Sequence, residues 1–267
     1  MRHPRRAGAL VAALVVVSTA AVATPGSGPA AGQPWDLVYI SDSSGWGVAR
    51  FYARQITEDR GAAVRVHDKW EMSLSTDVIL DRLRTPSHHL VRLVRDAEVI
   101  VVYGNPEVSE TPGHPQTGGN CMGDGRRPIS YGPKTWTRYI ADLKAIYRQV
   151  FELRKGRPVI LRTANWAMPI IGHGPTVPPG PSWEESGITD ACTAAWEMFA
   201  WAVSKAAIAY RVPVADVYTA FNGSGHREDP VEKGYIQGDN VHPNNAGRAV
   251  IAETLAALGY ERVQRPR

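Results

Sequence analysis

The chain has 267 residues and a formal net charge of +4, with 43% apolar and 21% charged residues, which fits one globular domain or at most two. Residues 1–23 contain three arginines and no acid, so the formal charge of the remainder falls to +1. The basic pI of about 9.1 therefore gives no reason to expect a nucleic acid or an anionic membrane as a partner.

The N-terminus has the pattern of a secretory signal peptide. Its arginines precede an apolar run at 9–17, and small residues at 21–23 end the pattern. Because the run is too short to span a membrane comfortably, we expect residues 1–23 to be cleaved and the protein to be secreted, without stable membrane insertion. An uncleaved N-terminal anchor is the alternative. Residues 24–34, rich in Gly, Pro, Ala and Ser, predict a flexible leader before a single folded domain at 35–267.

The rest of the chain alternates between short apolar runs and segments with helical spacing. The runs predict five strands, at 37–40, 63–66, 99–103, 158–161 and 212–217. The helical segments predict five helices, at 48–60, 76–83, 136–153, 189–210 and 245–258. Repeated strand–helix units imply an α/β fold in which helices cover both faces of a parallel sheet.

Asp239 and His242 lie three residues apart, just before the last predicted helix. In a short loop the carboxylate can accept a hydrogen bond from the imidazole Nδ1–H, which leaves Nε2 free as a general base. Asn244, two residues further on, can start the helix. A surface loop with a helix cap is the alternative, because an Asp-x-x-His pattern is short.

Such a pair needs a nucleophile, and the residues that follow the other strands offer one. Sites in open parallel sheets lie beyond the carboxyl ends of the strands. Ser43 follows the first strand, where its own backbone N–H and the start of a helix can stabilise a developing oxyanion. Asn105 follows the third strand and can add a side-chain N–H donor. Nucleophile, base, orienting acid and oxyanion donors are thus expected at one edge of the sheet.

Three stretches, 41–47, 96–105 and 239–243, resemble the nucleophile block, the oxyanion block and the closing Asp-x-x-His-Pro block of the SGNH hydrolases of the GDSL type. The resemblance extends over about residues 35–258. It implies a three-layer α/β/α sandwich with a flavodoxin-like, five-stranded parallel sheet. It also implies the activity of an esterase, a lipase or a carbohydrate deacetylase.

The resemblance implies a catalytic triad in which Ser43 is the nucleophile, His242 the base and Asp239 its orienting acid. Ser41 stands where the family usually has a glycine. Ser44, beside the nucleophile, is expected to cap or to face solvent, and Asp42 to accept structural hydrogen bonds.

The oxyanion hole implied by the resemblance consists of the Ser43 backbone N–H and the strand end at Gly104 and Asn105. The segment from Gly104 to Glu107 is one residue tighter than the family motif. The family's second-block glycine has no obvious match, and Ser73 lies in about the right place to supply a backbone donor instead.

Trp46 and Trp166, just past the first and fourth strands, are the candidate substrate-binding aromatics. Asn165 is a further candidate for the pocket lining, with a turn-forming role as an equal alternative. No P-loop, dinucleotide fingerprint or His-Glu-x-x-His motif is present, so no cofactor is expected. No metal is expected either, since metal-ligand spacing is lacking among the histidines at 67, 88, 89, 114, 173 and 226.

Cys121 and Cys192 are the two cysteines of the chain. A secreted chain with two cysteines and no metal spacing most simply pairs them, so we expect a disulfide that joins the long loops after strands three and four. Two free thiols are the alternative.

These features predict a secreted, cofactor-independent serine hydrolase that cleaves carboxylic esters of small molecules or glycans through an acyl-enzyme. A carbohydrate O-acetylesterase or an acyltransferase could use the same site. A non-catalytic, glycan-binding domain on the same fold is the alternative from outside enzymology.

Overall fold

The computed structural model of the protein describes residues 33–72, 74–104, 133–165, 171–174, 176 and 179–266. The predicted signal peptide and most of the predicted leader lie outside the described residues. Within the described ranges, no helix combines the length and the apolar character needed to cross a membrane.

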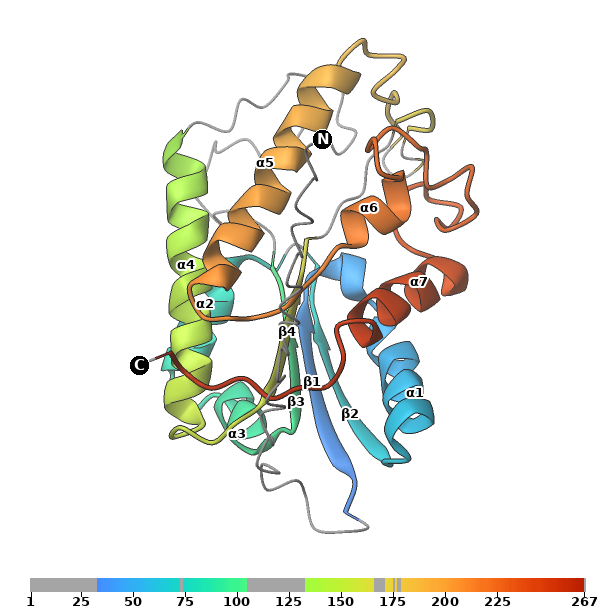
Figure 1. Cartoon of the computed structure of the whole chain (residues 1–267). Coiled ribbons are helices and arrows are strands. Elements are labelled where there is room, and N and C mark those ends of the chain that lie inside the picture. The colour runs from blue at the N-terminus through green and yellow to red at the C-terminus, as the bar shows by residue number, and fades with distance from the viewer. Residues whose placement is uncertain are drawn as a thin grey trace, which may run out of the picture.

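The core of the fold is a single five-stranded sheet, seen nearly edge-on in Figure 1. Its strand order is β2-β1-β3-β4-β5, and every neighbouring pair is parallel. This order is that of the flavodoxin-like, doubly wound sheets, as the sequence predicts. The strands are β1 (Trp35–Ser41), β2 (Val64–Trp70), β3 (Val99–Val102), β4 (Ile160–Ala164) and β5 (Val214–Ala215).

Two layers of helices cover the sheet, which confirms the predicted three-layer sandwich. On one face α1 packs against α7, and on the other α4 lies between α2 and α5 (Figure 1). The helices are α1 (Val48–Arg60), α2 (Thr76–Arg84), α3 (His89–Asp96), α4 (Pro133–Leu153), α5 (Thr189–Ile208), α6 (Val217–Asn222) and α7 (Asn245–Ala256).

The apolar runs of the sequence form the buried centre of the sheet. All four residues of β3 are fully buried, because helices cover both of its faces. β4 continues to Ala164, past the predicted end at residue 161, because the charged Arg162 ends the apolar run in the sequence although its side chain is fully buried. The Arg162 guanidinium donates to the carbonyls of Leu161, Gly259 and Glu261, so this buried charge is hydrogen-bonded and fixes the segment after α7.

The edge strands differ most from their predicted lengths. β2 continues to Trp70 because it pairs along its whole length with β1, although its outer positions are polar and half-buried. β5 ends at Ala215 because the next residue, Asp216, accepts a hydrogen bond from the Thr219 N–H and starts α6.

α3 spans only eight residues and is not predicted from the sequence. Two turns are too short to give a clear period, and α3 is stabilised by tertiary packing of Leu90, Val91 and Val94. The start of α7 is confirmed: the Asn244 side-chain oxygen Oδ1 accepts from the backbone N–H groups of Ala246 and Gly247.

Candidate active site

Ser43, His242 and Asp239 meet at the carboxyl edge of the sheet. Ser43 opens the short 3-10 helix η1 (Ser43–Gly45) directly after β1, and the other two residues lie in the loop that enters α7. The His242 Nε2 atom lies 3.0 Å from the Ser43 Oγ, and its Nδ1 atom lies 2.7 Å from an Asp239 carboxylate oxygen. This arrangement gives the imidazole one hydroxyl partner and one carboxylate partner, the geometry of a base that is oriented by an acid.

The Asp239 carboxylate is held from several sides. One oxygen accepts from the backbone N–H groups of Val241 and His242, each at 2.9 Å. The other accepts from the Gln237 side-chain amide at 3.1 Å, in addition to its contact with the imidazole. Burial alone would raise the pKa of Asp239, but the hydrogen bonds from His242 and Val241 outweigh it and place the pKa below its usual range.

The turn that carries the candidate nucleophile rests on a buried polar cluster. Asp42 caps η1 and accepts from the Ser44 N–H at 3.0 Å and from the Ser44 hydroxyl. Burial raises the pKa of the Asp42 carboxyl, and the hydrogen bonds from Ser44 oppose that shift. Ser41, which stands at the family's glycine position, is fully buried, and its hydroxyl donates to the Asp42 carbonyl. Asp42 thus has the structural role expected from the sequence. Ser44 does not, because it neither caps the helix nor faces solvent: it is fully buried, and its hydroxyl donates to the Asp42 cap.

Gly45 is required by the close packing of this turn. A Cβ at this position would collide with the hydroxyl groups of Ser41 and Tyr103. The Tyr103 hydroxyl in turn lies 3.1 Å from the Tyr39 hydroxyl, beneath the turn. No sequence motif points to Gly45, because its importance depends on Tyr103, which follows β3 far along the chain.

Only part of the predicted oxyanion hole falls on described residues. Gly104 follows β3 and is buried, and its carbonyl accepts from the Tyr139 hydroxyl at 3.0 Å. Asn105 and Ser73 lie outside the described residues. The oxyanion roles of Ser43, Gly104, Asn105 and Ser73 therefore stay predictions.

Trp46 follows η1 and is 42% exposed, and its role in substrate binding stays a prediction. Its ring lies 5.6 Å from the Trp70 ring, centroid to centroid, at the end of β2. The Arg248 guanidinium of α7 lies 4.7 Å from the centre of the same ring. Trp46 therefore forms a partly exposed surface close in sequence to the nucleophile.

Asn165 is buried, and both ends of its amide are hydrogen-bonded within the protein. The nitrogen donates to the Asp216 carboxylate at 2.7 Å, and the oxygen accepts from the Tyr218 N–H at 3.3 Å. Asn165 thus joins the end of β4 to the start of α6, which favours the turn-forming alternative over a role in the pocket. Trp166 lies outside the described residues.

Cys192 is buried in α5, and the described residues include no free cysteine. Cys121 lies outside the described residues, so the disulfide stays a prediction. Among the described residues, no group of three or more His, Cys, Asp or Glu side chains could hold a metal ion.

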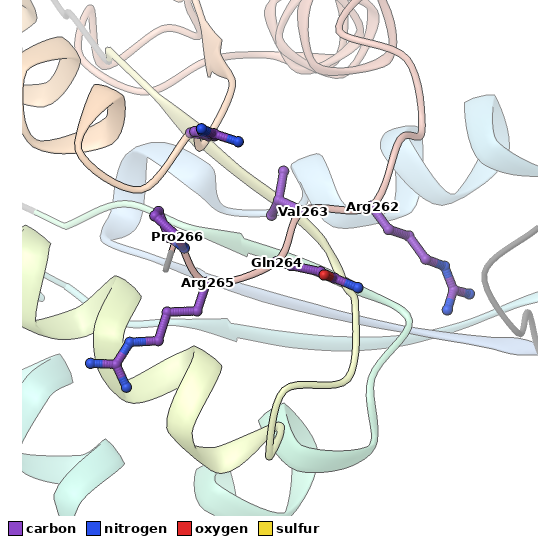
Figure 2. Close-up of a pocket in the computed structure, with 6 residues that line it drawn as sticks. Arg262, Val263, Gln264, Arg265 and Pro266 are labelled. Atoms are coloured by element: carbon purple, nitrogen blue, oxygen red, sulfur yellow. The ribbon is translucent and has the colours of Figure 1, made fainter. Parts of the chain in front are cut away.

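A pocket of about 570 Å³ lies at the opposite, amino edge of the sheet. Arg211 precedes β5, and Val263 pairs with Val159 just before β4. The Arg262 and Arg265 side chains extend in opposite directions (Figure 2), so their charges do not converge on one bound group. We therefore place the site at the carboxyl edge, with the Ser43 and His242 pair.

The fold is similar to those of solved lipases and esterases. A lipase from a goat rumen metagenome, Lip_vut3, is 19% identical with a TM-score of 0.60 over 85% of this chain and 98% of that one. A variant of Axe2, an acetyl xylan esterase from Geobacillus stearothermophilus, is 15% identical with a TM-score of 0.55 over 87% and 98%. A lipase/acylhydrolase from Enterococcus faecalis is 13% identical with a TM-score of 0.50 over 87% and 99%.

The sequence itself matches no family model, and no curated protein matches it. The chain therefore has the α/β/α fold of these lipases and esterases, as the resemblance implied.

The nucleophile can be tested with two neighbouring serines. Ser43→Ala should lower the rate of ester cleavage by about 10⁶-fold, because no acyl-enzyme can form. Ser44→Ala should keep most of the activity, since the Ser44 hydroxyl contacts Asp42 rather than His242. Steady-state kinetics and thermal melts of both variants measure this. An active Ser43→Ala variant beside an inactive Ser44→Ala variant would show that the nucleophile is misassigned.

The pH dependence follows from the lowered pKa of Asp239. Asp239 stays ionised as the pH falls into the mildly acidic range, so loss of its charge does not limit the rate there, and a histidine base accepts a proton only when neutral. The rate should therefore rise with pH across about pH 5 to 8. Asp239→Asn should lower it by about 10⁴-fold by favouring the wrong tautomer. A pH–rate profile that is flat over this range, with cleavage intact, would exclude His242 as the base.

Proposed function

We propose that this chain is an SGNH-type serine hydrolase that cleaves carboxylic esters. The observation that carries the proposal is the position of the His242 imidazole, between the Ser43 hydroxyl at 3.0 Å and the Asp239 carboxylate at 2.7 Å. The likeness of the fold to lipases and to an acetyl xylan esterase supports the same class of reaction.

In the proposed mechanism, the His242 Nε2 takes the proton from Ser43 as Oγ attacks the ester carbonyl. The Ser43 backbone N–H and the Asn105 amide stabilise the oxyanion that forms. His242 then donates the proton to the leaving alcohol, which leaves an acyl group on Ser43. Water, deprotonated by His242, attacks this ester, and the acid is released as Ser43 regains its proton.

Asp239 keeps its charge throughout this cycle. Its lowered pKa means that it does not accept the proton of the imidazolium, and it stabilises that cation by charge and orientation instead. The buried turn beneath Ser43 holds the hydroxyl in place, so little reorganisation is needed when the substrate binds.

We also propose that the protein acts outside the cell, on the basis of the signal-peptide pattern in residues 1–23. The predicted Cys121–Cys192 disulfide fits an oxidising compartment.

A second candidate, hydrolysis of acetylated glycans, is favoured by the surface at Trp46. A partly exposed indole with a guanidinium against its ring offers both an apolar face and N–H donors, which suits a sugar ring better than a long alkyl chain. The similar fold of an acetyl xylan esterase supports this substrate class.

The general proposal is tested with a fluorophosphonate probe and a panel of esters. The exported protein should be labelled at Ser43 and should hydrolyse p-nitrophenyl esters, and the acyl lengths that it accepts define the pocket. Acetylated xylo-oligosaccharides in the same panel separate the two candidates. Binding of glycans without labelling or turnover would instead identify the non-catalytic alternative.

If the substrate is an acetylated glycan, the Trp46 ring should contribute to its binding. Trp46→Ala should raise KM for an acetylated oligosaccharide about tenfold, the loss of roughly 1–1.5 kcal/mol of ring contact. Trp201→Ala is the matched control, because Trp201 is also half-exposed but lies on α5. Equal effects of the two substitutions on the glycan KM would remove the role of Trp46.

A further inference from the structure

We propose that Asp229 is a positioning residue for the catalytic acid, acting through a short segment that we call the brace: Gly172, His173, Gly174 and Thr176. The proposal rests on the proposed function, since it assigns Asp239 as the orienting acid. It adds a second Asp–His pair whose role is to hold the loop of the first.

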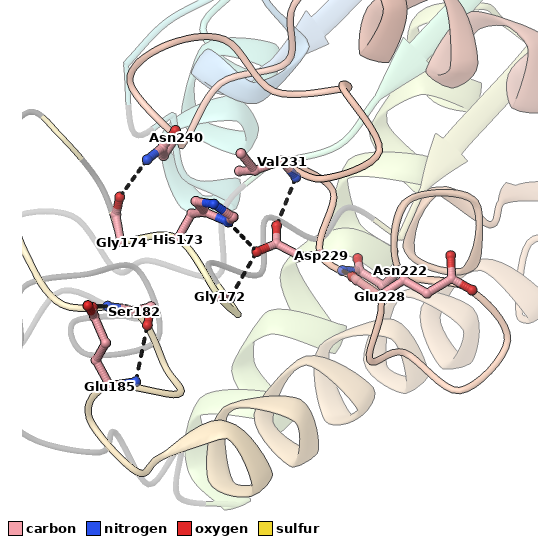
Figure 3. A network of polar contacts seen from close by, with 10 residues as sticks. All are labelled: Gly172, His173, Gly174, Ser182, Glu185, Asn222, Glu228, Asp229, Val231 and Asn240. Atoms are coloured by element: carbon pink, nitrogen blue, oxygen red, sulfur yellow. Dashed lines mark hydrogen bonds and ion pairs between the residues drawn. The ribbon is translucent and has the colours of Figure 1, made fainter.

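The first anchor of the brace is a buried carboxylate. Asp229 is only 7% exposed and lies in the segment between α6 and α7. Its Oδ2 atom accepts from the Gly172 backbone N–H at 2.9 Å and lies 2.8 Å from the His173 Nδ1, and its Oδ1 accepts from the Val231 N–H at 2.8 Å (Figure 3). The Val231 N–H holds the buried carboxylate, and the carboxylate in turn fixes Gly172 and His173 at the start of the brace.

The close approach of the brace to Asp229 depends on a glycine. A Cβ added at Gly172 would lie 2.9 Å from the Asp229 Oδ2, closer than real Cβ atoms come. The hydrogen bond with Asp229 also raises the pKa of His173. The contact between His173 and Asp229 therefore depends on the small size of Gly172 and on the negative charge of the carboxylate.

The second anchor joins the brace to the loop of the catalytic acid. The Thr176 N–H donates to the Asp239 carbonyl at 3.0 Å, and the Thr176 hydroxyl donates to the Gly238 carbonyl at 3.0 Å. The Asn240 side-chain amide donates to the Gly174 carbonyl at 2.9 Å (Figure 3). These bonds restrain Asp239 itself and the residues before and after it.

The catalytic loop needs such external support. Asn240 has a positive φ of 59°, a strained conformation that persists only where surrounding contacts offset its energetic cost. Asp239 must also place one oxygen 2.7 Å from the imidazole, and small displacements of catalytic groups can cost up to about 100-fold in rate. By fixing the main chain around Asp239, the brace keeps its carboxylate on the imidazole.

Thr176 offers a matched pair of variants. Thr176→Val keeps the branched shape but removes the hydroxyl donor to Gly238, whereas Thr176→Ser keeps the donor. Thr176→Val should lower kcat about tenfold with little change in KM, because a misaligned acid weakens transition-state stabilisation rather than binding. Thr176→Ser should retain the activity of the parent protein.

Asp229→Asn tests the first anchor. An amide has only one acceptor oxygen, so it cannot serve the Gly172 N–H and His173 on one side and the Val231 N–H on the other, and kcat should fall as in Thr176→Val. Glu228→Gln is the control, because the neighbouring Glu228 carboxylate pairs with Lys233 on the surface. It should leave kcat and KM unchanged.

A spectroscopic readout separates positioning from general destabilisation. The proton shared by His242 Nδ1 and Asp239 should give a far-downfield ¹H NMR resonance in the full-length exported protein. This resonance should broaden or shift in Thr176→Val and Asp229→Asn, and persist in Thr176→Ser and Glu228→Gln. The NMR measurement needs no substrate, so it tests the brace even if no ester is cleaved, an outcome that would reject the proposed function alone.

Three outcomes would overturn the role of the brace: parent-like kcat and resonance in Thr176→Val, a rise in KM at constant kcat, or a loss that Thr176→Ser does not rescue. If Asp229→Asn does not fold, the two Thr176 variants decide whether the brace positions Asp239, because the Thr176 side chain is exposed and its substitution should not prevent folding.

Discussion

The hydrogen bond between Ser43 and His242 depends on the parallel sheet. Its two residues lie 199 positions apart in the chain, and no local structure could bring them together. β1 delivers Ser43 at its carboxyl end, and α7, which packs against α1 on the same face, fixes the loop that carries His242. The buried strands of the sheet thus set a distance of 3.0 Å between atoms from the two ends of the domain.

The rigidity of the nucleophile turn has an energetic cost that the core offsets. Asp42 is a buried carboxyl group, and desolvation of such a group is unfavourable. Hydrogen bonds from Ser44 compensate part of this cost, and Gly45 lets the turn lie against Tyr103 without a clash. The result is a candidate nucleophile whose position is fixed before any substrate binds, which is what electrostatic catalysis requires.

The sequence predicts the features that depend on local pattern. The buried run of β3 and the Asn244 cap are of this kind, and so is the Asp239–His242 spacing, because each involves neighbouring residues. Asn165 shows the limit of this reasoning: its position after a strand is equally compatible with a pocket and a turn, and only its contact with Asp216 decides between them.

Asp229 and Thr176 could not have been found from the sequence, because no motif links them and their importance arises from loops that meet in space.

The position of the brace links the choice of substrate to the alignment of Asp239. The brace belongs to the connection between β4 and α5, and such connections at the carboxyl edge are the segments that shape binding sites in this fold. A change in this connection would therefore alter the alignment of Asp239 as well as the surroundings of the substrate. Trp46 contacts Trp70 and Arg248, on β2 and α7, so substitutions there can change ligand contacts while leaving the brace intact. Under the proposed function, the surface at Trp46 can vary with substrate more freely than the connection that holds the proposed catalytic acid.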